Sequence, residues 1–113
     1  MNQKSKTGRV LLQKELALVL ALIPEGSISQ WHVPEGARVL DMEDGGMGSI
    51  RFVKESHHRR AGSIAKAKYV DEDGVLVSIE LNISEDNELF EVDFWKVDFS
   101  PLRRYPRPED LIR

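Results

Sequence analysis

Residues 63–99 have the sequence SIAKAKYVDEDGVLVSIELNISEDNELFEVDFWKVDF, which carries the strongest fold signal of the chain. Apolar side chains occupy every second position from Val75 to Ile83, the period that is typical of a β-strand with one buried face. The segments on either side alternate in a similar way, and a short polar turn separates each of them from this strand. We therefore predict three consecutive antiparallel strands in this stretch.

The two turns between these strands set the pairing of their residues. Asp71-Glu72-Asp73-Gly74 suits a type I turn closed by a bulge at Gly74, which places Ala67 opposite Ile79. Residues 84–87 suit a four-residue loop, which places Ile79 opposite Val92. On this register one face holds only apolar side chains, namely those of Ala65, Ala67, Tyr69, Val75, Val77, Ile79, Leu81, Ile83, Phe90, Val92 and Phe94. A slip by one residue would bring polar side chains into that face.

The opposite face of the predicted strands carries charge. Its cross-strand rows are Lys66, Glu80 and Glu91, followed by Lys68, Ser78 and Asp93. Opposite charges that face each other across strands contribute roughly 0.2–1 kcal/mol per pair, so we expect this face to be at least partly solvated. Phe94 and Trp95 are adjacent, which predicts a bulge or bend that gives Trp95, Val97 and Phe99 new surroundings.

A helix is predicted from Arg9 to Ile23. Leucine and valine recur there at three- and four-residue spacing, Thr7 is a candidate N-cap, and Pro24 followed by Gly26 ends the pattern. The helix is apolar on most of its circumference, which is typical of a helix that is deeply buried or shared with a partner.

Two further strands are predicted over residues 37–42 and 49–53, followed by a charged loop over residues 54–62. An irregular connection precedes them, and we expect Trp31 to pack there as an anchor.

The expected fold class is α+β, with an N-terminal helix packed on an antiparallel β-meander of four to five strands. The length of 113 residues fits one domain over residues 1–113, in which we expect residues 1–6 and 107–113 to be flexible.

The amino-acid composition argues against several classes of function. The net charge of −3 argues against nucleic acid as the partner, because phosphate neutralisation needs clustered lysine and arginine. There is no cysteine, which excludes disulfides, thiolate nucleophiles and cysteine-ligated zinc and is compatible with a cytoplasmic location.

The N-terminus resembles a signal peptide only superficially. The apolar run from Leu16 to Ile23 directly follows Lys14 and Glu15, and no small-x-small cleavage site follows it. The run is also too short to span a bilayer, so we expect no membrane association.

Three carboxylates form the most chemically suggestive group. Glu80 and Glu91 are predicted to face each other, with Asp93 diagonal to them, so they could share a proton, hold a divalent cation or act as acid and base. The alternative is a solvated face on which lysines offset their repulsion, and we favour it because charged residues are routine there.

The loop residues His57, His58, Arg59 and Arg60 make a cationic cluster that could meet an anionic ligand or partner. Adjacent histidines on an extended loop point to opposite sides and make a poor chelate, so we predict no metal site and favour a solvated loop. No other catalytic or metal signature occurs, and no cofactor is implied.

A glycine cluster spans residues 44–49, DGGMGS. It could cradle a phosphate, but the P-loop lysine is absent, a strand follows instead of a helix, and three acidic residues lie close by. We therefore favour a hairpin turn.

The sequence resembles a small bacterial family catalogued only as a domain of unknown function. The resemblance rests on DGGMGS at 44–49, YVDEDGV at 69–75 and LFEVDFWKV at 89–97, and covers about residues 9–106. It implies a stand-alone bacterial domain of this size and brings no catalytic residues.

The leading hypothesis is a non-catalytic protein-interaction module that binds a protein partner or a second copy of itself. The apolar helix and the aromatic residues Trp31, Trp95 and Phe99 could form its interface.

Two other classes stay open. An immunity-type inhibitor would present Glu80, Glu91 and Asp93 to a basic toxin surface. A small enzyme or ligand-binding domain would combine those carboxylates with Arg51, Arg59 or Arg60 around a pocket.

Overall fold

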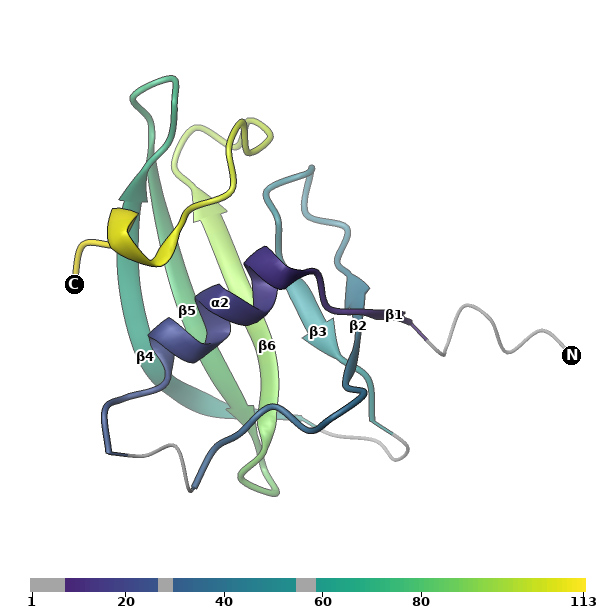
Figure 1. Ribbon diagram of the computed structural model, residues 1–113. Coiled ribbons are helices and arrows are strands. Elements are labelled where there is room, and N and C mark those ends of the chain that lie inside the picture. The colour runs from purple at the N-terminus through teal and green to yellow at the C-terminus, as the bar shows by residue number, and fades with distance from the viewer. Residues whose placement is uncertain (1–7, 27–29, 55–58) are drawn as a thin grey trace, which may run out of the picture.

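The computed structural model of the protein describes residues 8–26, 30–54 and 59–113. These residues form an α+β fold with one α-helix and one six-stranded antiparallel sheet (Figure 1). The elements are β1 (Arg9–Val10), α2 (Gln13–Leu22), β2 (Arg38–Asp41), β3 (Ile50–Phe52), β4 (Arg60–Val70), β5 (Leu76–Ser84), β6 (Leu89–Lys96) and the 3-10 helix η1 (Pro108–Asp110). The fold class is as predicted, but the sheet has six strands where four to five were expected.

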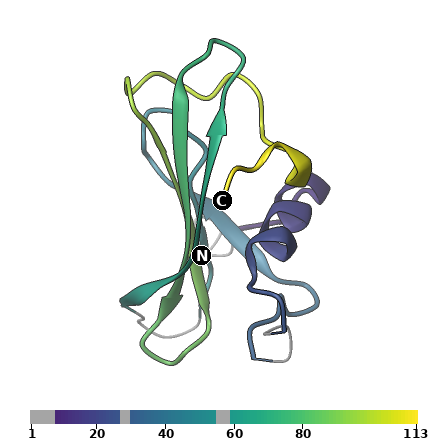
Figure 2. The ribbon, with the colours of Figure 1, turned by 90° about the vertical axis from the view of Figure 1, so that its left-hand side faces the viewer.

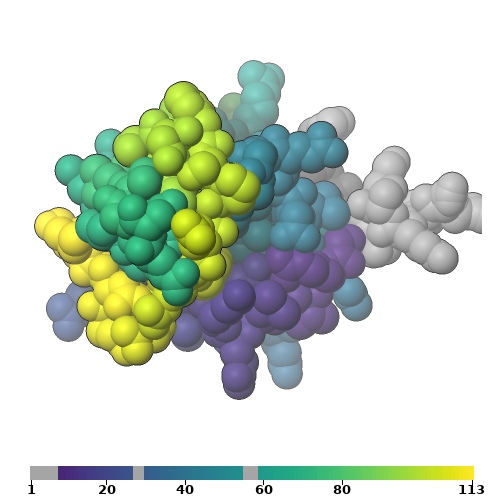
Figure 3. Space-filling model, turned by 90° about the horizontal axis from the view of Figure 1, so that it is seen from above, coloured from purple at the N-terminus to yellow at the C-terminus, as the bar shows by residue number. Residues whose placement is uncertain are grey.

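The strand order is β1-β2-β3-β6-β5-β4, so two three-stranded meanders join edge to edge through β3 and β6. The helix α2 and the C-terminal segment lie on one face of the sheet, which we call the inner face (Figure 2). Within residues 8–26, 30–54 and 59–113, no helix or second sheet covers the other face. Seen from above, the C-terminal segment lies alongside α2 (Figure 3), where the guanidinium of Arg113 donates to the carbonyl oxygen of Ala21.

The helix begins at Gln13 and not, as predicted, at Arg9. Arg9 and Val10 pair with Val39 and Arg38 of β2 instead. The Arg9 guanidinium donates to Glu15 at 2.8 and 2.7 Å and to Asp41 at 2.7 Å, contacts that a periodicity analysis does not detect. Leu12 is the N-cap residue, and the candidate cap Thr7 lies outside the described residues.

The core forms between α2 and the inner face of the sheet. The helix contributes Leu18, Val19 and Leu22, all of which are fully buried. The sheet contributes the fully or almost fully buried side chains of Val39, Ile50, Val77, Ile79, Leu81, Val92 and Phe94. Trp31 packs against this cluster as predicted, whereas Leu12, Leu16 and Leu20 of the helix are exposed.

The register between β4 and β5 is the predicted one. Ala67 pairs with Ile79, Lys66 with Glu80, and the turn ends at Gly74 with φ of +80°. The Gly74 amide donates to the Asp71 carbonyl at 2.8 Å, which closes the expected turn.

The register between β5 and β6 differs from the prediction by two residues. Ile79 pairs with Phe94 where Val92 was expected. One residue of the shift comes from the turn, where Asn87 at φ +66° closes a three-residue loop. The Ser84 amide there donates to the Glu88 carbonyl at 2.8 Å. The other comes from a bulge at Phe90. Because the two shifts add to an even number, the remaining side chains that were predicted to point inward still lie on the inner face.

Phe90 itself is buried but lies outside the core cluster, contrary to the prediction. Its ring lies under the guanidinium of Arg51 at 4.8 Å. The predicted break at Trp95 is also absent, because Phe94 is buried, Trp95 is exposed and Lys96 is buried, so the alternation continues to the end of β6.

Candidate functional site

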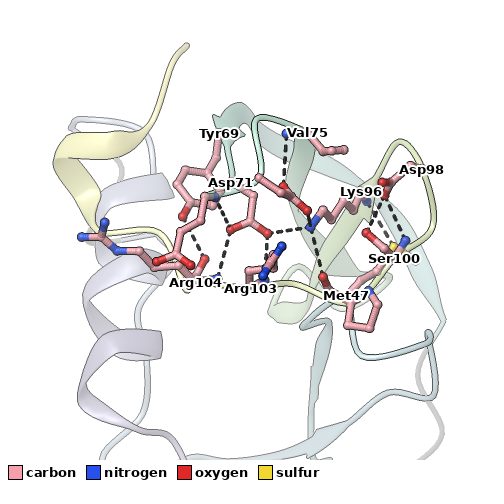
Figure 4. A network of polar contacts seen from close by, with 12 residues as sticks. Met47, Tyr69, Asp71, Val75, Lys96, Asp98, Ser100, Arg103 and Arg104 are labelled. Atoms are coloured by element: carbon pink, nitrogen blue, oxygen red, sulfur yellow. Dashed lines mark hydrogen bonds and ion pairs between the residues drawn. The ribbon is translucent and has the colours of Figure 1, made fainter.

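Lys96 at the end of β6 points to the inner face and is fully buried. Its ammonium donates to the carboxylates of Asp71 at 2.8 Å and Asp73 at 2.7 Å, and to the carbonyl oxygen of Pro101 at 3.1 Å (Figure 4). Burial disfavours the charged ammonium, but these bonds outweigh it and raise the pKa of Lys96. The charge is therefore retained in the interior because all three donors have an acceptor.

Asp71 is the centre of this network. Burial alone raises the pKa of its carboxyl, but hydrogen bonds from Lys96 and from backbone N–H groups outweigh burial and lower it to about 2. The backbone donors belong to Arg103 at 2.8 Å, Glu72 at 2.7 Å and Arg104 at 3.0 Å. These contacts bind the C-terminal segment to the turn between β4 and β5.

A second turn follows directly after Lys96. The Phe99 amide donates to the Lys96 carbonyl at 2.9 Å, and the Asp98 carboxylate accepts from Ser100 at 3.0 and 2.7 Å. Phe99 has φ of +65°, a left-handed conformation that is costly for a bulky residue. The buried network thus lies immediately beneath a strained turn that carries an aromatic residue.

Around this turn, apolar residues gather on the uncovered face of the sheet, which we call the outer face. Val70 of β4 pairs with Leu76 of β5, and Val97 donates to the Leu76 carbonyl at 3.0 Å, so the three lie in one cross-strand row. Trp95 and Phe99 adjoin this row, with their rings in edge contact at 5.0 Å. Trp95 is 49% exposed and Phe99 63% exposed. We call Val70, Leu76, Trp95, Val97 and Phe99 the outer-face patch.

Charged rows border the outer-face patch. Trp95 lies in register with Ser78 and Lys68, and the next row holds Asp93, Glu80 and Lys66. Burial raises the pKa of the Asp93 carboxyl, and the negative charges of Glu91 and Glu80 raise it further. In the isolated chain Asp93 is thus a carboxylate in an unfavourable environment.

The predicted pairing of Glu80 with Glu91 is wrong. The shifted register places Asp93 opposite Glu80, and Asn82 opposite Glu91. Glu91 accepts from Arg51 at 3.1 Å and from Asn82 at 3.0 Å, so it is held in a separate polar group. The three carboxylates therefore do not form the expected cluster around a Glu80–Glu91 pair.

The predicted cationic loop divides into two parts. Arg60 lies at the start of β4 and forms an ion pair with Glu80 at 3.5 Å, while the Arg59 carbonyl accepts from the Glu85 amide at 3.0 Å. His57 and His58 lie outside the described residues. In the described parts of the chain, no three His, Asp or Glu side chains come together to hold a metal ion.

The glycine cluster is a hairpin turn between β2 and β3. The Asp44 carboxylate accepts from the amides of Met47 and Ser49, both at 3.0 Å, so these donors are not free for a phosphate. The Leu102 amide donates to the Gly46 carbonyl at 3.0 Å, which places the C-terminal segment against the turn.

A cleft of about 350 Å³ lies at the other end of the sheet. Its lining includes Trp31, Arg38, Lys54, Asn87 and Glu88. Lys54 pairs with Glu88 at 2.6 Å and the Trp31 ring N–H donates to Asn87 at 3.3 Å, so the polar groups of this wall bind one another.

The sequence contains a signal for the buried network in the spacing of Lys96. Lys96 follows Val92 and Phe94 at the spacing of inward-facing residues, which demands buried acidic partners. The acidic turn at 71–73 supplies them, although local chemistry alone predicts only a turn there.

Comparison with known proteins gives one family. No curated protein matches the chain, and no solved structure matches it. None of the helices in the described parts of the chain has the length and apolar character needed to span a bilayer. The family model described as Domain of unknown function (DUF6984) matches residues 8–106, which include the buried network and the outer-face patch, and the chain therefore belongs to this family.

Proposed function

We propose that this domain is a non-catalytic protein-interaction module whose binding surface is the outer-face patch. The observation that carries the proposal is the conformation of Phe99, which is left-handed, 63% exposed and in contact with Trp95. A left-handed non-glycine residue costs of order 1–3 kcal/mol, and such strain concentrates at functional sites.

Folding alone does not account for the aromatic side chain at this position. Phe99 is outside the core, and glycine would adopt the same turn without strain. Trp95 and Phe99 together present aromatic surface of the kind that supplies the central contacts of protein interfaces. The Lys96–Asp71 ion pair beneath them is sealed from solvent, which suits a rigid support better than a reactive group.

The other two function classes are less well supported by the side-chain contacts. Glu91 is neutralised by Arg51, and Glu80 lies within 4.0 Å of both Arg60 and Lys66. Carboxylates that already have cationic partners are less available to a substrate or to a basic toxin surface.

Site-specific photocrosslinking tests the proposal. The photoreactive amino acid p-benzoylphenylalanine replaces Val97 in the outer-face patch, or Gln13 on the exposed side of α2 as the matched control, in cells that produce the protein. We expect a protein adduct from position 97, absent from position 13 and lost when Trp95→Ser is added. Equal adducts from both positions, or none from position 97, would contradict the proposal.

A further inference from the structure

Nine residues of the outer face form a regular array of three strands by three rows. Reading from β4 across β5 to β6 and the residue after it, the rows are Lys66–Glu80–Asp93, Lys68–Ser78–Trp95 and Val70–Leu76–Val97. We call these nine residues the outer-face array. Its two cations, Lys66 and Lys68, lie on β4, and Asp93 and Trp95 lie in the same two rows on β6.

This arrangement is complementary to itself. When two such faces meet about a two-fold axis that runs along β5, β4 of each copy lies over β6 of the other. Lys66 then meets Asp93, Lys68 meets the ring of Trp95, and Val70 meets Val97. Each contact is of a favourable kind: an ion pair, a cation–π contact and an apolar contact.

We propose that the outer-face array binds a second copy of this chain, sheet against sheet, about a two-fold axis along β5. The proposal rests on the proposed function, because it names the partner of the same surface. Facing sheets pack about 10 Å apart with strand directions within about 30°, a geometry that an uncovered antiparallel sheet face can adopt.

The state of the charges in the single chain supports this partner. The Lys66 side chain is 72% exposed and its ion pair with Glu80 is long, at 4.0 Å, so its ammonium can also reach a carboxylate of another chain. Asp93, whose pKa is raised in the isolated chain, would gain a cation from the second copy.

The size of the array predicts a weak dimer. Three strands spaced about 4.8 Å apart, with five residues of about 3.3 Å each, cover roughly 14 Å by 17 Å. This is well below the roughly 800 Å² per partner of a standard interface. Glu80 also lies next to the axis and faces its own copy, which opposes association. We therefore expect a reversible dimer that forms at high protein concentration.

Sedimentation velocity over a concentration series, from low micromolar to millimolar, tests the proposal with five proteins besides the natural one. Trp95→Ser, Lys66→Glu and Asp93→Lys should each raise the dimer dissociation constant about tenfold or more. The double variant Lys66→Glu with Asp93→Lys should recover most of the affinity, because the ion pair is restored with its signs exchanged. Leu16→Ser on the exposed side of α2 is the matched control and should leave the constant unchanged.

Several results would overturn the proposal. A natural protein that stays monomeric throughout would do so, as would a dimer that Leu16→Ser abolishes and Trp95→Ser does not. If the double variant has a native fold by circular dichroism but does not recover affinity, then Lys66 and Asp93 do not pair about the proposed two-fold axis. If the protein is monomeric but position 97 crosslinks to a different protein, the interaction module stands and the second copy is wrong. If neither occurs, both proposals fail.

Discussion

The Nζ atom of Lys96 lies 2.8 Å from Oδ2 of Asp71, and neither side chain exposes any surface to solvent. The two residues are 25 positions apart, and their contact joins the end of β6 to the turn between β4 and β5. The same carboxylate binds the backbone of Arg103 and Arg104, so one ion pair positions three segments of the chain. The turn that presents Phe99 begins at Lys96, so its orientation depends on this pair.

Replacement of Asp71 by asparagine should destabilise the fold, because it leaves the buried Lys96 ammonium without one of its two carboxylates. Breaking a buried ion pair from one side costs about 3–5 kcal/mol. Because Asp73 remains at 2.7 Å, we expect the free energy of unfolding at pH 7 to fall by about 3 kcal/mol in urea denaturation. The exposed neighbour Glu72→Gln serves as the control and should change it by less than about 0.5 kcal/mol.

The loss should also depend on pH in a defined direction. The pKa of Asp71 is lowered from 3.8 to about 2, so its ionised form stabilises the fold above pH 3.8, and this contribution disappears as the pH falls through about 2. Other aspartates, such as Asp41 and Asp73, also have lowered pKa values, so the comparison of the two proteins isolates Asp71. Melting curves of the natural protein and Asp71→Asn should converge toward pH 2. A constant difference across this range would contradict the assignment.

Two substitutions of Phe99 should separate the strain of its backbone from the contact of its ring. Both Phe99→Gly and Phe99→Ala remove the edge contact with Trp95, but only glycine adopts φ of +65° without cost. We expect Phe99→Gly to be more stable than Phe99→Ala by about 1 kcal/mol in thermal or urea unfolding. Equal stability of the two variants, or greater stability of the alanine variant, would show that residue 99 is not left-handed.

The substitution Asp93→Asn should stabilise the isolated chain at pH 7. Burial and the charges of Glu91 and Glu80 raise the pKa of Asp93, so ionisation of this group costs stability as the pH rises above its unfolded value. Like charges directly opposite each other on a sheet cost about 0.2–1 kcal/mol, and we expect a gain of this size. Thermal unfolding at low protein concentration measures it. The gain should vanish at acidic pH, where Asp93 is protonated, and a loss at pH 7 would refute the assignment.

Local chemistry predicted the parts of the fold in which neighbouring residues decide the outcome. The turn at Asp71–Gly74 closes as expected, because its glycine adopts a positive φ that fixes the register of β4 on β5. The turn that contains Asn87 has no glycine. Because asparagine also adopts positive φ, this sequence is compatible with two loop lengths. The actual loop is one residue shorter than predicted, and together with the bulge at Phe90 it places Glu80 opposite Asp93 and not opposite Glu91.

The helix illustrates a different limit. Leucines cover most of its circumference, so periodicity could not decide which of them face the sheet. The buried Glu15, bound to Arg9 and therefore to β2, sets the rotation of α2 and leaves Leu12, Leu16 and Leu20 exposed. A polar contact between distant segments thus goes with a choice that the apolar pattern left open.

Three properties follow from the sequence alone: the alternation of side chains along β4 and β5, the α+β class, and the family to which the chain belongs. These properties follow from side-chain period and turn residues, which act over a few positions. Three other properties appear only in the folded chain: β3 lies against β6, Lys96 is buried with Asp71 and bound to Asp73, and Trp95 meets Phe99 on the outer face. Whether a charge is buried or an aromatic side chain is exposed depends on which distant segments of the chain lie over it. Those segments come together only when the chain folds.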